Sequence, residues 1–238
     1  MAASGIGQAP LHTGKPRHTQ ILMPIYFMLL DATQFHQEII PALSASWRQR
    51  SFAPCLALCS SLLSALQGFE KRFHVTADQA MMVKMLQGLA YDRHRWKLLA
   101  GEILLVAAAE APEIQTVPET MLCLLAPEAY PGESPEREGF PSIQQAHYGA
   151  RDLDFGGKVY RPEKAGYNDS GDVQRLAEYL KAQNPEQWTA ADLRRLRGVS
   201  SDAEREEELE FAREWFPALR DLYETALANK QVVVCEVM

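Results

Sequence analysis

The sequence predicts a mainly helical α+β protein in which several helices surround one small sheet. Apolar residues recur at helical spacing through much of residues 31 to 126 and 141 to 238. Strand-like apolar runs open and close this part of the chain, ILMPIYFMLL at 21 to 30 and VVVCEV at 232 to 237. We expect these two runs to lie side by side in one sheet, together with a β-hairpin near residues 152 to 161.

The 238 residues are enough for one globular domain with a substantial core, which we expect from residue 21 to residue 238. Two helical lobes, 31 to 126 and 141 to 238, are joined by a surface loop at 127 to 140 that is rich in proline and charge. Residues 1 to 20, rich in Gly, Pro, Thr and Ser, predict a mobile tail. The run at 21 to 30 is too short to span a bilayer, which favours a buried strand over a membrane anchor or a signal peptide.

Residues typical of helix starts predict several separate helices in the first lobe. Asp31 and Gln34 form a capping box ahead of an apolar stripe at four-residue spacing, and Pro41 is expected to bend this helix. Residues 52 to 67 are apolar nearly all round and predict a core helix. Further helices are expected from Thr76 and from Asp92, the latter running until Pro112 stops it. The stripe of the first helix consists of Phe35, Ile39, Leu43 and Trp47.

The second lobe carries equally clear signals, after a segment at 117 to 127 whose pattern fits a short helix and a buried strand equally well. One helix is expected to start at Ser170 or Asp172, and a short one to be capped by Thr189. The longest helix spans 202 to 229, with Pro217 expected to kink it. Its predicted buried stripe is Ala212, Phe216, Leu219, Tyr223 and Ala226.

Charge and cysteine content narrow the function classes. A net charge of -7 argues against a protein that binds nucleic acid through its phosphates. We expect no membrane partner either, because the sequence contains no apolar stretch of transmembrane length. The four cysteines lack the paired CxxC spacing of a zinc site and do not have the density of a secreted disulfide scaffold. We therefore expect reduced, packed thiols in a cytoplasmic protein, with no metal and no cofactor.

The stretch HYGARDLDFGGKVYRPEKAGYND at 147 to 169 has neither helical nor strand periodicity. Gly156 and Gly157 predict a two-residue hairpin turn, because glycine adopts the positive φ angles that such a turn demands. The resulting register places Asp152 opposite Arg161. It also gathers Leu153, Phe155 and Tyr160 on one inward face, while AGYND at 165 to 169 reads as a turn.

This stretch is also the candidate functional site, for which three readings stay open. The first is a recognition surface of a binding or regulatory module with a protein or small-molecule partner. The second is an enzyme of the hydrolase or transferase class, with His147 as general base or metal ligand, Asp152 or Asp154 orienting it and Arg161 stabilising an anion. The third is a purely structural connection, with the function elsewhere. The candidate residues are His147, Tyr148, Arg151, Asp152, Asp154, Tyr160, Arg161, Tyr167 and Asp169.

Overall fold

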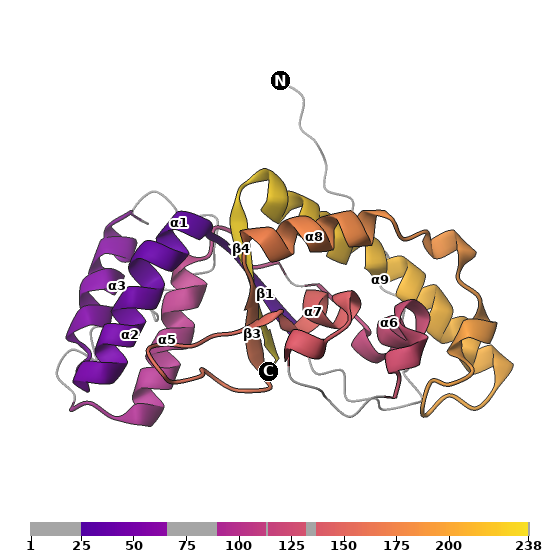
Figure 1. The fold of residues 1–238 in the computed structure, drawn as a ribbon, viewed down its shortest axis with the longest axis horizontal. Helices are drawn as coiled ribbons and strands as arrows, with labels where there is room; N and C mark the ends of the chain where they lie inside the picture. The colour runs from indigo at the N-terminus through magenta and orange to yellow at the C-terminus, as the bar shows by residue number, and fades with distance from the viewer. Residues whose placement is uncertain (1–24, 66–89, 113, 132–136, 238) are drawn as a thin grey trace, which may run out of the picture.

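A small antiparallel sheet stands between two groups of helices in the computed structural model of the chain (Figure 1). The structure describes residues 25 to 65, 90 to 112, 114 to 131 and 137 to 237. The expected tail at 1 to 20 and the expected helix from Thr76 lie outside these described residues. The class is the one predicted, a mainly helical α+β fold with one small sheet.

The sheet has the strand order β1-β4-β3-β2, with every neighbouring pair antiparallel. Strands β1 (Ile25–Asp31) and β4 (Gln231–Val237) pair along their whole length, which confirms the predicted meeting of the two apolar runs. Strand β3 (Ala165–Asn168) pairs with β4 and with the two-residue strand β2 (Arg151–Asp152). The segment AGYN, expected as part of a turn, is therefore a strand, because its neighbour β4 supplies the partners for its backbone.

Two hydrophobic cores lie on the two faces of this sheet. Successive side chains of a strand point to opposite faces, so Phe27 and Leu29 enter one core while Met28 and Leu30 enter the other. Both faces of β1 and β4 are covered, which explains why these strands are apolar almost throughout. The sheet is therefore the structural centre on which both helical groups pack.

The first helical group consists of α1 (Ala32–Gln34), the π-helical turn η1 (Phe35–Ile39), α2 (Ile40–Gln49), α3 (Ala53–Ala65) and α5 (Arg93–Ala107). The predicted cap is present, since the Asp31 carboxylate accepts a hydrogen bond from the Gln34 amide at 2.8 Å. The disturbance expected from Pro41 takes the form of the π turn just before it, in which the Ile40 amide donates to the Phe35 carbonyl.

Helix α5 begins where expected, with the Asp92 carboxylate accepting from the His94 and Arg95 amides. Its predicted end at Pro112 is wrong, because the helix stops at Ala107. The chain there turns to the outer edge of β1, where the Ala109 amide donates to the Leu29 carbonyl at 2.7 Å. Satisfying that strand edge outweighs continuing the helix.

The second helical group contains α6 (Pro118–Leu125), α7 (Ser142–Tyr148), α8 (Ser170–Lys181) and α9 (Asp202–Ala228), with short 3-10 turns at Pro127–Ala129, Arg137–Gly139, Pro185–Gln187 and Ala190–Leu193. The ambiguous segment at 117 to 127 is thus helical. Helix α8 starts at Ser170, the first of the two predicted positions, and Asp169 caps it. Ser201 caps α9, whose predicted apolar stripe is buried throughout.

The hairpin tip has the predicted register. Gly156 and Gly157 have φ angles of 72° and 90°, and the Phe155 amide donates to the Lys158 carbonyl at 2.9 Å. The expected inward face, Leu153, Phe155 and Tyr160, is fully buried. The loop thereby docks on the first helical group, as the sequence predicted.

The predicted pair of Asp152 and Arg161 is wrong. Asp152 lies opposite Gly166 in the sheet and forms an ion pair with Arg137, whereas Arg161 binds Glu236 of β4. The reason is a turn immediately after the hairpin, in which the Ala165 amide donates to the Arg161 carbonyl at 3.0 Å. This turn leads the chain away from Asp152 before a second hairpin strand can reach it.

Candidate functional site

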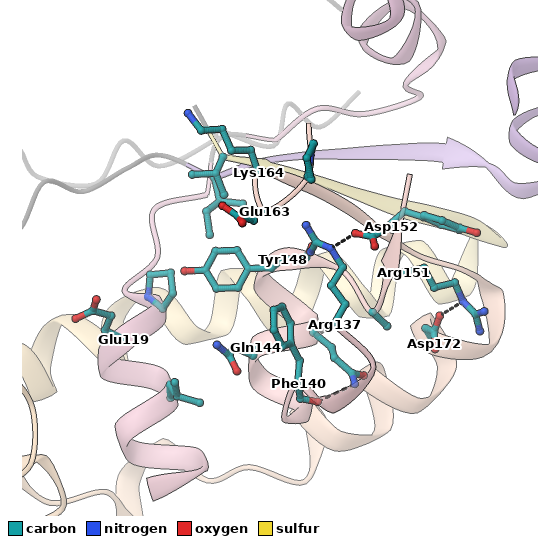
Figure 2. A pocket seen from close by; sticks show the side chains of 18 of the residues that line it. Glu119, Arg137, Phe140, Gln144, Tyr148, Arg151, Asp152, Glu163, Lys164 and Asp172 are labelled. Carbon is teal, nitrogen blue, oxygen red and sulfur yellow. Dashed lines mark hydrogen bonds and ion pairs between the residues drawn. The ribbon is translucent and has the colours of Figure 1, made fainter. Parts of the chain in front are cut away.

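A cleft of about 1370 Å³ lies where the β2 edge of the sheet meets α6, α7 and α8 (Figure 2). Its walls come from parts of the chain that are far apart in sequence, including the loop that precedes β3 and the one end of the β1–β4 pair where Ile25 lies opposite Val237. The lining residues are Ile25, Pro118, Glu119, Leu122, Tyr130, Pro131, Arg137, Phe140, Gln144, Gln145, Tyr148, Ala150, Arg151, Asp152, Pro162, Glu163, Lys164, Tyr167, Asp172, Arg175, Arg197 and Val237.

Tyr148, the last residue of α7, projects into the middle of this cleft, and its hydroxyl is turned toward the Glu119 side (Figure 2). Burial and the neighbouring Glu119 carboxylate raise the pKa of the Tyr148 hydroxyl to about 12. The phenol therefore stays protonated at neutral pH. Its oxygen has no hydrogen-bond partner among the described residues, so it is available as a donor to a bound molecule.

Arg137 forms the back of the cleft and fixes its shape. The side chain is 9% exposed and donates to the Asp152 carboxylate at 2.6 Å, to the Ala165 carbonyl at 3.0 Å and to the Tyr148 carbonyl. Gly166 makes room for it, because a Cβ there would lie 2.6 Å from a guanidinium nitrogen and 2.3 Å from the Tyr148 carbonyl oxygen. Arg137 thereby ties the loop before α7 to the sheet edge.

A network of charges closes one end of the cleft. The Arg151 Nε lies 2.7 Å from the Asp172 carboxylate and 2.9 Å from that of Asp169, while Arg175 approaches the other oxygen of Asp172 at 3.4 Å. Burial opposes ionisation of Asp172, but the hydrogen bond and charge of Arg151 hold its pKa below the usual value. Because Arg151 and Arg175 remain about half exposed, both guanidinium groups stay accessible from the cleft.

Other charged side chains line the cleft with no hydrogen-bond or ion-pair partner for their side chains in the part of the chain that the structure describes. They are Glu119, Glu163, Lys164 and Arg197. With Arg137, Arg151, Asp152, Asp172 and Arg175 included, the lining has five basic and four acidic side chains, and the Asp169 carboxylate beside Arg151 balances the fifth basic group. The cleft thus holds charges of both signs in equal number, although the protein as a whole has a net charge of -7.

His147 lies outside the cleft and is fully buried. One ring nitrogen lies 2.8 Å from the Ile143 carbonyl, so it carries the proton and donates, while the other lies 2.5 Å from the Thr116 hydroxyl and accepts from it. Burial lowers the pKa of His147 to about 4. Because its partners are a threonine and a carbonyl, the aspartate that the enzyme reading requires is not beside it.

The nine candidate residues divide into two groups. Those that line the cleft are Tyr148, Arg151, Asp152 and Tyr167. The others hold the scaffold: Asp169 caps α8, the Asp154 carboxylate accepts from the Gly157 amide at 2.6 Å, and the Tyr160 hydroxyl and Arg161 both contact Glu236. With His147 internal, five of the nine therefore serve the structure of this region.

Sequence reasoning missed most of the cleft, including Glu119, Arg137, Lys164, Arg175 and Arg197. They lie on α6, on α8 and in loops, where the sequence shows no local sign of a shared site. They come together only in the folded chain, in which β3 pairs with β2 on one side and with β4 on the other. Arg137 lies in the loop at 127 to 140, which the proline and charge content predicts as a surface loop, so the sequence does not indicate that this arginine is buried.

No family model, curated protein or solved structure matches this chain. Within the described ranges, no cluster of three or more His, Cys, Asp or Glu side chains has the arrangement of a metal site. No helix in those ranges is long and apolar enough to cross a membrane. The four cysteines are free and buried. The candidate function therefore has to be argued from the cleft itself.

Proposed function

We propose that the protein is a binding module and that the cleft between the β2 edge, α6, α7 and α8 is its ligand site. The observation that carries this proposal is the convergence on one concavity of an apolar floor, an available tyrosine hydroxyl and accessible guanidinium groups. Binding sites typically combine a mostly apolar wall with a few well-placed polar groups. Four of the nine residues singled out from the sequence also lie there.

The lining indicates an elongated ligand with an apolar part and an acidic group. Ile25, Leu122 and Val237 supply the apolar contact, and Tyr148 donates a hydrogen bond. Arg197 and Lys164 supply positive charge, because neither side chain forms an ion pair with a described residue, whereas Glu119 and Glu163 require that the acidic group of the ligand lies away from them. The volume of about 1370 Å³ exceeds the roughly 300 to 1,000 Å³ of pockets for drug-sized molecules. A peptide segment carrying a carboxylate or phosphate fits these requirements.

The pKa shifts of Tyr148 and Asp172 favour binding over acid–base catalysis by these two groups. A general acid or base works best when its pKa lies near neutral pH. Tyr148 is shifted away from neutrality, upward to about 12, and Asp172 is shifted downward. His147, the proposed general base, is buried behind the cleft with a pKa of about 4. These groups suit fixed hydrogen bonds and charges.

Filling the cleft tests the proposal. Gln144 lines it from α7, so Gln144→Trp should occupy ligand space without disturbing the buried core. Gln174→Trp, on the exposed face of α8 and outside the cleft, is the matched control. Thermal unfolding is followed with carboxylate- and phosphate-bearing metabolites and with short, partly apolar peptides that carry one acidic residue.

We expect at least one compound to raise the melting temperature of the wild type and of Gln174→Trp but not of Gln144→Trp. If every stabilising compound protects Gln144→Trp as well as it protects the wild type, the cleft is not the ligand site. If no compound of this chemistry stabilises the wild type, the assigned ligand class is wrong.

A further inference from the structure

Two sequence features that the cleft does not use, the hairpin tip and the basic start of α5, meet around Trp47 of α2. The Arg93 guanidinium carbon lies 5.3 Å from the centre of the Trp47 ring, and the Lys158 ammonium nitrogen lies 6.0 Å from it. Arg48 faces the same hairpin tip, because a Cβ on Gly156 would lie 3.4 Å from its Nε. Arg50 is three residues from Trp47 at the end of α2, and its amide donates to the Trp47 carbonyl at 3.3 Å. We call Trp47, Arg48, Arg50, Arg93 and Lys158 the Trp47 patch.

The Trp47 patch stands on a rigid base. Trp47 packs edge-on against the fully buried Trp96, with ring centres 5.0 Å apart, and Trp96 in turn packs against Phe155 of the hairpin at 5.7 Å. These aromatic contacts join α2, α5 and the hairpin. The basic side chains therefore project from one fixed platform rather than from independent loops.

The positive charge of the Trp47 patch is not neutralised within the described residues. None of its four basic side chains forms an ion pair there. The neighbouring carboxylates of Asp92 and Asp154 accept hydrogen bonds from backbone amides instead. Asp92 accepts from two amides at the start of α5, and Asp154 accepts from the Gly157 amide. They reduce the net positive charge but leave most of the guanidinium and ammonium donors open. Arg48 uses only its Nε, which donates to the Ser44 carbonyl at 3.4 Å.

One of these charges, that of Arg93, stands where the helix dipole disfavours it. Arg48 and Arg50 lie at the carboxyl end of α2, where the helix dipole attracts cations. Arg93 lies in the first turn of α5, where the dipole repels a cation, and it shares one aromatic ring with Lys158. A residue that goes against a local rule in this way is expected at functional sites, and here the Trp47 ring holds the guanidinium group in place.

We propose that the Trp47 patch is a docking surface for an acidic segment of a partner protein. Arginine binds carboxylates through paired hydrogen bonds, and a half-buried tryptophan beside arginine is typical of the residues that dominate protein interfaces. Protein carboxylates fit better than nucleic acid, because four cations on a protein of net charge -7 neutralise few phosphates. This surface is separate from the cleft and does not depend on its proposed function.

The probe is labelled poly-L-glutamate at low ionic strength, followed by fluorescence anisotropy. We expect the wild type to bind and the double variant Arg93→Gln/Lys158→Gln to bind about tenfold more weakly or worse, since the removed charges contact the probe directly. The matched control Lys181→Gln/Arg194→Gln, which removes the same charge from exposed positions outside the patch, should change binding by less than about twofold. Gln144→Trp should bind poly-L-glutamate like the wild type.

Three results would overturn the proposal: no binding by the wild type, equal weakening in both double variants, or a single-stranded DNA oligonucleotide that binds more tightly than poly-L-glutamate and is lost with Arg93 and Lys158. The last would make the surface a nucleic-acid site. Both substituted residues lie at the surface, and melting temperatures close to that of the wild type will show that the variants are folded. A fourth result would also overturn the proposal: if Gln144→Trp loses binding, poly-L-glutamate binds in the cleft and not on the Trp47 patch.

Discussion

Acidification should destabilise this protein through His147, whose buried imidazole holds a proton far more weakly in the folded state than in the unfolded one. Burial lowers the pKa from 6.5 to about 4. Between these values the unfolded chain binds more protons at this residue, so the stability present above the unfolded pKa is lost as the pH falls toward 4. The neutral ring accepts from the Thr116 hydroxyl and donates to the Ile143 carbonyl, and protonation turns the accepting nitrogen into a donor, so that the bond to Thr116 has to reverse its direction.

The size of the effect follows from the two pKa values. The full difference is worth about 3 kcal/mol, of which about 2 kcal/mol is lost between about pH 7 and about pH 5. Glu236 acts in the opposite direction: burial raises its pKa in the folded state, so protonation of this carboxyl favours folding as the pH falls. The contribution of His147 therefore has to be isolated with a variant that does not titrate.

The assay is urea unfolding of the wild type and of His147→Gln at both pH values. The variant should be less stable near neutral pH, because it loses a buried pair of hydrogen bonds, but the wild type should lose about 2 kcal/mol more on acidification. Equal losses in the two proteins would refute the reasoning. The wild-type imidazole can be followed by NMR as a check that needs no variant, and titration of His147 near pH 6.5 in the folded protein would refute it as well.

Three further predictions concern the scaffold. Gly166→Ala should destabilise the protein by more than about 2 kcal/mol in urea unfolding, because the new methyl group would collide with the Arg137 guanidinium and the Tyr148 carbonyl oxygen. The control Gly171→Ala, at the start of α8, should change the stability by at most about 1 kcal/mol, and equal effects of the two substitutions would contradict the packing around Gly166. Arg161→Ala should lower the free energy of unfolding by about 2 to 3 kcal/mol, because it leaves the Glu236 carboxylate buried without its cation. The loss should be smaller at low pH, where that carboxyl is protonated, and a pH-independent loss below about 1 kcal/mol would contradict the ion pair. All four cysteines should react with a thiol reagent only after unfolding, since burial raises their pKa values, and rapid reaction of the folded protein would show that a thiol is exposed.

The elements that could be predicted from sequence are those whose signals are local. The β1–β4 pair follows from two strongly apolar runs, and the hairpin tip follows from Gly156 and Gly157 between residues of alternating burial. Asp31, Asp92 and Ser201 act as helix caps because a side chain two or three residues away from an amide can reach it in any fold.

The errors arose where a distant partner decides the structure. AGYN has little strand propensity by itself and becomes β3 only because β4 lies beside it. Arg161 was paired with a nearby aspartate, yet it binds Glu236, 75 residues away. The cleft was missed for the same reason, since α6, the loop with Arg137 and the segment with Lys164 meet only in the folded molecule.

The central claim, that the cleft is a ligand site, is tested most directly by mapping amide chemical shifts with the compound that most stabilises the wild type. The claim predicts that the largest changes fall on cleft residues such as Tyr148, Arg151 and Lys164, while the amides of Trp47 and Lys158 stay unchanged. Changes concentrated around Trp47, or spread over the surface without reaching Tyr148 and Arg151, would contradict it.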